Sequence, residues 1–396
     1  MNASLTSDQQ KISNLAGALA REAFAPRAAA LDAAAALPLE NLADLQAAGL
    51  LTLTIGKDLG GHGSGIGGED PLLYLLVLEQ ISRVCLPTSH CLQVHCHAAH
   101  FIDQLGTNAQ RHDILGDIIT HGALMTTLSS EPGRTARGSR NESVAQPTDT
   151  GWTLSGVKNY ATLAGASTWL LVLADARVTG TGTYSPVAIA DGERLALVTK
   201  ADAPGVSFVD QSWNAPGMRP AVSPTVRFDQ CQIGWNRVIG ESNAHLSGNW
   251  SVKADLGFAA QYVGAAQGLL DSAIQAVRHR STTTDQHVQR HVGRLHFAVD
   301  SARALYREAA RLWTLDDKQE AGLASIGAKH LAIETANQVL DITARIVGPT
   351  AFSSGTTLER QFRDLRFLTM REHPDQAATT VGKTLLEATT GAIHAT

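Results

Sequence analysis

The chain has 396 residues, of which 44% are hydrophobic and 17% charged, and its formal net charge is −5. This length predicts two or three domains, and the composition is that of a soluble globular protein. The negative charge and the lack of a long basic run argue against a nucleic-acid partner. No apolar stretch reaches the roughly 18 residues of a membrane span, and the N-terminus lacks a secretory pattern. We therefore expect a cytoplasmic protein with no membrane partner.

The first part of the chain, to about residue 121, shows a helical pattern. An amphipathic helix is expected from Leu39 to Ala48, closed by Gly49. Glycines crowd residues 50–68, but no GxGxxG follows a strand and no Lys-Ser/Thr follows the glycines. A flexible loop is therefore favoured over a phosphate cradle. Two further helices are expected at 71–84 and 88–105.

The helix expected at 88–105 is rich in histidine and cysteine. Its spacings form neither a CxxC pair nor an HExxH motif, so a packed helix is favoured over a metal site, and no metal is expected. The four cysteines of the chain are too few for a disulfide framework. The residues concerned in this helix are His90, Cys91, His95, Cys96, His97 and His100.

The pattern changes near residue 122 and again near residue 238. Short alternating runs separated by turn residues predict a β-rich domain in between. Long helices rich in alanine, leucine and glutamine then predict a helical bundle. The expected domains are an N-terminal α-helical domain (1–121), a middle β-domain (122–237) and a C-terminal bundle (238–396). The helices expected in the bundle cover 258–278, 286–312, 321–347 and 377–392.

The segment Val347–Glu372, VGPTAFSSGTTLERQFRDLRFLTMRE, joins a Gly-Pro turn to a charged run. It resembles the C-terminal signature of acyl-CoA dehydrogenases, GGNGYxxExPVERxxRDAKIxxIYEGT. The match fails at both ends, where Pro-Thr-Ala replaces a glycine-rich turn and His-Pro replaces Gly-Thr. The overlay pairs Glu359-Arg360 with the ER pair, Arg363-Asp364 with the RD pair and Glu372 with the family's catalytic glutamate.

Earlier segments resemble other motifs of this superfamily in the correct order. Residues 129–132, Ser-Ser-Glu-Pro, followed by Gly138-Ser139, resemble the TEPxxGSD loop with an insertion. Residues 156–162 resemble the GxKxWIT strand, in which the Thr162 hydroxyl reaches a flavin near N5 and Tyr160 replaces the tryptophan. Gln286-x-x-Gln289 with Arg303 resembles the FQxxQ…AAR helix.

The resemblance implies an α+β, acyl-CoA dehydrogenase-like fold with a helical N-terminal domain, a central β-barrel domain and a C-terminal four-helix bundle. It also implies FAD, or FMN, as the cofactor, since a flavin ring needs an apolar slot with a few hydrogen bonds near its reactive edge. The cofactor-binding residues implied are Ser129, Ser130, Ser139, Tyr160, Thr162, Arg280, Arg345 and Gly348.

Two reactions stay open. In a dehydrogenase a carboxylate removes the α-proton of an acyl thioester while the β-hydride goes to the flavin, and Glu372 occupies the base position. Asp255 lies close to the alternative base position. Three departures favour the flavin monooxygenases of this fold instead: the segment after Arg280 is shortened, the turn at Gly348 is altered and the YEGT context is lost.

The monooxygenase branch, which includes dibenzothiophene monooxygenase and 4-hydroxyphenylacetate hydroxylase, uses reduced flavin from a separate reductase. It reacts that flavin with O₂ to form a C4a-hydroperoxide, held by a hydroxyl at the Thr162 position. The resemblance makes His373 the candidate acid/base, and His95 or His97 can border the substrate cavity.

We therefore expect a flavin-dependent oxidoreductase, a monooxygenase in preference to an acyl-CoA dehydrogenase, acting on a small molecule or an acyl thioester. A catalytically silent flavin-fold binding protein is the third alternative. The resemblance also implies a homotetramer and a flavin reductase or electron-transfer partner.

Overall fold

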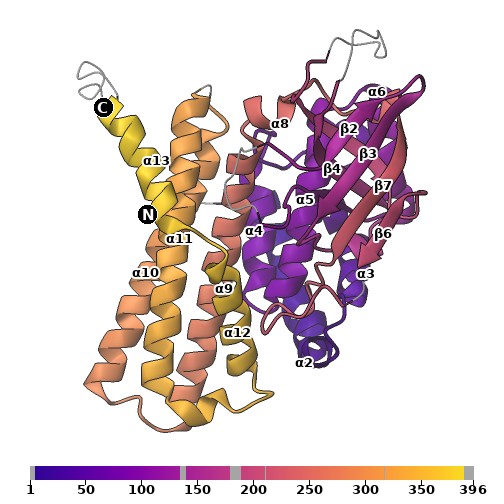
Figure 1. Cartoon of the computed structure of the whole chain (residues 1–396). Coiled ribbons are helices and arrows are strands. Elements are labelled where there is room, and N and C mark those ends of the chain that lie inside the picture. The colour runs from indigo at the N-terminus through magenta and orange to yellow at the C-terminus, as the bar shows by residue number, and fades with distance from the viewer. Residues whose placement is uncertain (1–4, 134–139, 179–188, 210, 316, 388–396) are drawn as a thin grey trace.

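The computed structural model describes residues 5–133, 140–178, 189–209, 211–315 and 317–387. Figure 1 shows three parts, with the N-terminal helices lying between a curled sheet and a bundle of long helices. The order of helices, strands and helices confirms the expected fold class. Ser139, one of the implied cofactor residues, lies outside the described residues.

The N-terminal part is helical because its helices have clear capping signals and apolar faces. Thr6 caps the first helix by accepting the Gln9 N–H, and Asp70 caps the fourth ahead of Pro71. The helices are α1 (Ser7–Leu19), α2 (Ala25–Ala34), α3 (Leu39–Ala47), α4 (Pro71–Ser82), α5 (Leu86–Leu105), α6 (Asn108–Gln110) and α7 (Gly116–His121). Short π or 3-10 turns interrupt them at η1 (Ala20–Phe24), η2 (Leu50–Thr52), η3 (Lys57–Leu59) and η4 (Arg111–Leu115).

Among the described residues, the middle part is one seven-stranded sheet. Its order is β1-β4-β2-β3-β7-β6, with β5 paired antiparallel to β4. Every residue of β4 is buried, as its continuous apolar run predicts. The strands are β1 (Met125–Leu128), β2 (Val144–Pro147), β3 (Gly151–Lys158), β4 (Trp169–Ala176), β5 (Arg194–Lys200), β6 (Val206–Val209) and β7 (Thr225–Gly234). The 3-10 turns η5 (Ala164–Ala166) and η6 (Trp235–Arg237) follow β3 and β7.

The last part is a bundle built around the long helix α9. Gly264 and Gly268 allow close contact with α4, because a Cβ there would lie 2.3 Å from the Glu79 carbonyl oxygen and 2.0 Å from that of Arg83. One hydrophobic core joins the N-terminal helices to the bundle. The helices are α8 (Ala244–Ser247), α9 (Trp250–His279), α10 (Gln286–Leu312), α11 (Lys318–Val347), α12 (Thr357–Met370) and α13 (Pro374–Glu387), with the 3-10 turn η7 (Pro349–Phe352) between α11 and α12.

The four cysteines are buried free thiols, in agreement with the absence of a disulfide framework in the sequence. None of the helices in the described ranges combines the length and apolar character that a membrane crossing requires.

Candidate active site

Glu372 follows α12, and side chains from two other helices hold its carboxylate. Its Oε1 accepts a hydrogen bond from the Tyr262 hydroxyl of α9 at 3.0 Å. Its Oε2 lies 2.6 Å from Lys329 Nζ of α11, and only 6% of the side chain is exposed. Arg371 Nε lies 3.4 Å from Oε1. A buried carboxylate thus has three side-chain partners.

Lys329 is shared between two carboxylates. Its Nζ lies 3.0 Å from Asp255 Oδ1 on α9 as well as contacting Glu372. The Phe258 ring lies beneath both cations, with its centroid 5.3 Å from Lys329 Nζ and 4.4 Å from Arg371 Cζ. Two cations therefore balance two carboxylates, which satisfies the rule that buried charges need partners. Below, the carboxylate cluster means these residues: Asp255, Phe258, Tyr262, Lys329, Arg371 and Glu372.

The pKa of Glu372 is lowered. Burial is the largest single influence and would raise the pKa, but the charges of Lys329 and Arg371 and the hydrogen bonds from Lys329 and Tyr262 together outweigh it. Glu372 is therefore ionised at neutral pH, which is the protonation state that a general base requires.

His373 lies apart from this cluster although it is the next residue in the chain. Its side chain is exposed, and its backbone carbonyl accepts the N–H groups of Gln376 and Ala377 in the first turn of α13. The ring makes no hydrogen bond or ion pair with any described residue. Its geometry is that of a helix start at the surface.

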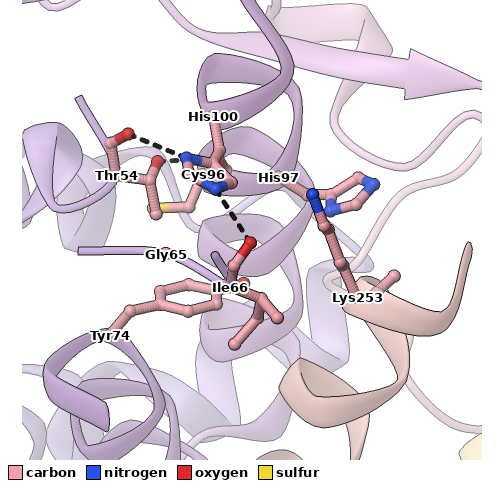
Figure 2. Close-up of a pocket in the computed structure, with 9 residues that line it drawn as sticks. Thr54, Gly65, Ile66, Tyr74, Cys96, His97, His100 and Lys253 are labelled. Carbon is pink, nitrogen blue, oxygen red and sulfur yellow. Dashed lines mark hydrogen bonds between the residues drawn. The ribbon is translucent and has the colours of Figure 1, made fainter. Parts of the chain in front are cut away.

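His95 and His97 occupy different environments on α5. His95 is fully buried, with Nε2 3.0 Å from the Leu51 carbonyl oxygen and Nδ1 accepting the Met125 N–H at 3.2 Å. Burial lowers its pKa to about 4, so the ring is neutral and links α5 to η2 and β1. His97 instead lines a small cavity beside Lys253 (Figure 2).

Ser129, Ser130 and Tyr160 come together at one edge of the sheet. The two serines are exposed after β1, and the Asn159 N–H donates to the Ser130 carbonyl oxygen at 3.0 Å. Tyr160 is 66% exposed and has a φ of +51°. Such an exposed aromatic ring is an available face for a ligand.

Two buried polar atoms beside this edge have no hydrogen-bond partner among the described residues, namely Thr127 Oγ1 and Asn159 Oδ1. Unpaired buried polar atoms are rare in native proteins and indicate an absent ligand or water. An exposed aromatic ring with such atoms nearby fits a planar ring system that hydrogen-bonds through its edge. The residues present therefore fit a flavin.

Thr162 is buried rather than exposed at this edge. Its Oγ1 lies 2.8 Å from Ser223 Oγ, and the Ser223 hydroxyl donates to the Ala221 carbonyl oxygen at 2.5 Å. The Thr162 hydroxyl consequently donates to Ser223, and its lone pairs remain available as acceptors.

Arg280 and Gly348 lie together where α9 and α11 end, and Arg345 lies in the last turn of α11. Arg280 donates to the Val347 carbonyl oxygen and to Thr350 Oγ1. Gly348 has a φ of +66°, which favours glycine. Arg345 is exposed, 4.0 Å from an Asp341 carboxylate oxygen.

Lys329 and Tyr262 are functional residues that were not predicted from the sequence. Lys329 belongs to a stripe of small buried residues on α11 that includes Ala321, Ser325, Ala328 and Ala332. A lysine inside such a stripe is a signal for a buried charge that needs a partner. No group of three or more His, Cys, Asp or Glu side chains in the described ranges is placed to hold a metal ion.

Family models of acyl-CoA dehydrogenases match two parts of the chain. The N-terminal domain model matches residues 6–121 and the C-terminal domain model matches residues 256–378. A probable acyl-CoA dehydrogenase of Mycobacterium leprae is 28% identical over 372 residues, covering 91% of this chain and 90% of the relative. A 3-sulfinopropanoyl-CoA desulfinase of Paraburkholderia xenovorans is 26% identical over 378 residues, with 92% of each chain covered.

Solved structures from both branches share the fold. Butyryl-CoA dehydrogenase from Megasphaera elsdenii matches with a TM-score of 0.85 at 22% identity, covering 98% of this chain and 100% of that one. FMN-bound TdsC from Paenibacillus sp. A11-2, a dibenzothiophene monooxygenase, matches with a TM-score of 0.83 at 22% identity, covering 95% and 97%. The chain belongs to the acyl-CoA dehydrogenase superfamily of flavin-dependent oxidoreductases.

Proposed function

We propose that this protein dehydrogenates an acyl thioester between its α and β carbons, with Glu372 as the base. The observation that supports this choice is the buried, ionised Glu372 carboxylate held by Tyr262 and Lys329. The alternative acid/base His373 is exposed and outside the cluster. The geometry thus favours the dehydrogenase alternative over the monooxygenase.

In this proposal Glu372 accepts the α-proton of the thioester on a carboxylate oxygen. The side chains of Asp255, Lys329 and Glu372 are only 6–9% exposed, so little water reaches the carboxylate that takes the proton. Tyr262 holds Oε1 and Lys329 holds Oε2, which fixes the carboxylate plane. Lys329 must shift toward Asp255 when Glu372 becomes neutral, because the charge that it balances then disappears.

Ser129, Ser130, Tyr160 and Thr162 would hold the flavin. When bound, the flavin supplies an acceptor for the β-hydride. Tyr160 would cover the ring system, and the Thr162 hydroxyl would lie at its reactive edge. We propose that Arg280, Arg345 and Gly348 contact the flavin of a neighbouring subunit, with FAD preferred over FMN.

Flavin-dependent monooxygenation is the second candidate. It is supported by the departures from the dehydrogenase signature around Gly348 and His373 and by the fold shared with TdsC. In that case His97 at its cavity, rather than Glu372, would handle the proton of the reaction.

A dehydrogenase needs a partner that reoxidises its flavin. A solved electron-transferring flavoprotein of Acidaminococcus fermentans shares the fold, with a TM-score of 0.86 at 22% identity, covering 98% of this chain and 100% of that one. We propose an electron-transfer flavoprotein as the partner and a homotetramer as the assembly. A monomer by light scattering would refute the assembly.

The experiment that separates the candidates starts from the purified protein and its visible spectrum. Acyl-CoA with an artificial electron acceptor should be oxidised, and Glu372→Gln should abolish that turnover. Turnover only with reduced flavin and oxygen would establish the monooxygenase instead. A protein that binds no flavin in either redox state would be the silent binding protein.

A further inference from the structure

The segment between β6 and β7 packs closely against the middle of α12. Below, the crossing loop means its residues 213–224. Arg363 Nη1 of α12 donates to the Pro216 carbonyl oxygen of the crossing loop at 2.8 Å. A Cβ on Gly217 would lie 2.2 Å from the Arg363 carbonyl oxygen, so only glycine lets the two backbones approach this closely.

Asp364 holds the crossing loop from the side of α12. It is 4% exposed, and its Oδ1 accepts the Met218 N–H at 2.6 Å. Met218 is also buried and has a φ of +54°, a strained conformation for a residue other than glycine. Burial raises the pKa of Asp364 to about 7, and both the carboxylate and the neutral acid can accept this N–H. The bond therefore fixes a turn that would otherwise relax.

The turn that begins at Met218 leads directly to the side chain of Thr162. The Ala221 N–H donates to the Met218 carbonyl oxygen at 2.9 Å, and the Ala221 carbonyl oxygen accepts the Ser223 hydroxyl. Ser223 Oγ in turn lies 2.8 Å from Thr162 Oγ1. A continuous series of hydrogen bonds thus connects Asp364 to the Thr162 hydroxyl.

The backbone around Thr162 bonds to the same loop. The Ala161 N–H donates to the Pro224 carbonyl oxygen at 3.1 Å. The Leu163 N–H donates to the Val222 carbonyl oxygen, also at 3.1 Å. Because the loop holds both the side chain and the flanking backbone, the position of the Thr162 hydroxyl depends on where the loop lies.

The far end of α12 holds Glu372. The Glu372 N–H donates to the Thr369 carbonyl oxygen at 3.2 Å, and the Leu368 carbonyl oxygen accepts the Tyr262 hydroxyl at 3.1 Å. The five residues from Asp364 to Thr369 span about 7.5 Å along the helix. One contact between α12 and the crossing loop therefore relates the Glu372 carboxylate to the Thr162 hydroxyl.

We propose that Asp364 is a positioning residue, which sets the Thr162 hydroxyl relative to Glu372 by docking the crossing loop on α12. This inference rests on the proposed function, which places the base at Glu372 and the flavin edge at Thr162. A proton and a hydride leave adjacent carbons in that reaction, so the two groups must keep a fixed separation. A misplacement of about 1 Å can cost about 100-fold in rate.

Hydrogen exchange tests this contact without turnover. Asp364→Leu removes the acceptor at nearly constant size, whereas Asp364→Asn keeps an oxygen that can accept the Met218 N–H. In Asp364→Leu the Met218 and Leu163 amides should exchange about tenfold faster, because each depends on the docked loop. In Asp364→Asn both should exchange at about the rate of the unmodified protein. Mass spectrometry of peptides from the crossing loop and from residues 159–165 measures these rates.

Ser272→Ala is the matched control for a lost hydrogen bond of α12. Ser272 Oγ donates to Gln361 Oε1 at 2.7 Å, on a side chain that does not contact the crossing loop. This variant should leave the exchange of Met218 and Leu163 unchanged. If Asp364→Leu does not fold, native-state exchange of the unmodified protein in low denaturant replaces it. The two amides should then show the same dependence on denaturant, as members of one cooperative unit do.

Flavin reduction and flavin affinity separate positioning from simple stability. When an acyl-CoA is mixed anaerobically with each variant, Asp364→Leu should lower the limiting rate of flavin reduction about 10- to 100-fold. The apparent Kd of the acyl-CoA should change little, and Asp364→Asn should restore most of the rate. Thr162→Ala should weaken flavin binding less in Asp364→Leu than in the unmodified protein, since both changes act on the same hydroxyl.

A folded Asp364→Leu that reduces its flavin at the unmodified rate would overturn the inference. So would faster exchange at Met218 without faster exchange at Leu163, a different denaturant dependence of the two amides, or Asp364→Asn as impaired as Asp364→Leu. Failure of the proposed function looks different, because then no acyl-CoA reduces the flavin of any variant. The exchange rates and the flavin affinities would in that case still decide whether Asp364 positions Thr162.

Discussion

Two buried lysines in this molecule pair with carboxylates that are held in different ways, one by backbone groups as well as a side chain and the other by side chains alone. In the β-domain, Lys158 Nζ lies 2.7 Å from Glu131 Oε1, and Glu131 also accepts the backbone N–H groups of Glu142 and Ser143. In the bundle, Lys329 is shared by Asp255 and Glu372, and every described partner of Glu372 is a side chain. The first carboxylate is fixed by the backbone, whereas the second can exchange partners by side-chain rotation.

These two kinds of partner distinguish a carboxylate that stabilises the fold from one that can react. The pKa of Glu131 falls to about 2 although burial alone would raise it, because Lys158 and two backbone N–H groups stabilise the carboxylate. A group so stabilised gives up its negative charge only at extreme pH. Glu372 is also ionised, but its partner Lys329 contacts a second carboxylate, that of Asp255. Lys329 therefore keeps an anionic partner when Glu372 takes up a proton. We expect chemistry at Glu372 and stability from Glu131.

The largest effect that would test this contrast is the loss of Glu372. Glu372→Gln should lower kcat for an acyl thioester by about 10³-fold, because a neutral amide cannot accept the α-proton. Steady-state rates with an artificial electron acceptor measure it, and circular dichroism checks the fold. An unchanged rate would remove Glu372 from the mechanism.

The second effect concerns the free energy of unfolding, for which the Glu131 site should matter more than the Glu372 site. Glu131→Gln should destabilise the protein by about 3–5 kcal/mol, because the fully buried Lys158 loses its carboxylate partner. Glu372→Gln should cost less, since Lys329 keeps Asp255. Denaturant unfolding of both variants at pH 7 makes the comparison, and equal losses would contradict the distinction.

The Glu131 pair also predicts a direction with pH. A carboxyl whose pKa is depressed in the folded state stabilises the protein above its unfolded pKa of about 4.3. That contribution disappears as the pH falls through about 2. Between pH 5 and pH 2 the unmodified protein should therefore lose stability faster than Glu131→Gln, as measured by thermal unfolding.

A smaller effect should appear in the pH profile of Lys329→Gln. Lys329 is one of the groups that lower the pKa of Glu372, so its removal should raise that pKa and move the acidic limb of kcat/KM to higher pH. Repulsion between the two remaining carboxylates acts in the same direction. Lys200→Met, a lysine change at the end of β5, should leave the limb in place, and a limb that does not move in Lys329→Gln would show that Glu372 is not its source.

The smallest expected effect is on flavin affinity. Thr162→Ala should weaken flavin binding about 2- to 10-fold, the value of one hydrogen bond, and Ser223→Ala should weaken it less because Ser223 acts through Thr162. Flavin release followed by fluorescence measures both. In the monooxygenase alternative Thr162→Ala should instead abolish most activity while binding changes little.

Much of the fold could be predicted from periodicity and end signals. The helix expected at 286–312 coincides with α10, and Gly49 has the positive φ expected of a helix end. The start of α9 was wrong by eight residues, since it begins at Trp250 rather than Phe258. Its first two turns have no side-chain cap and include the charged residues Lys253 and Asp255. These charges interrupt the apolar periodicity that would otherwise have indicated the start of the helix.

The site was less predictable than the fold because its residues come from distant positions that only the packing of the helices brings together. Glu372 could be inferred from its resemblance to a family signature, but Lys329 is 43 positions away from it and comes close only through the packing of α11 on α9. His95 and His97 differ by two positions and look equivalent in sequence. Only the fold places one in a packed contact and the other beside a cavity.

The base role of Glu372 can be tested most sharply without oxygen. The flavin-loaded protein would be mixed with an acyl-CoA in the absence of oxygen while its absorbance near the flavin maximum is followed. If Glu372 is the base, the unmodified protein should bleach promptly with a substrate and Glu372→Gln should not. A flavin that stays oxidised with every acyl-CoA tested would contradict a base role for Glu372.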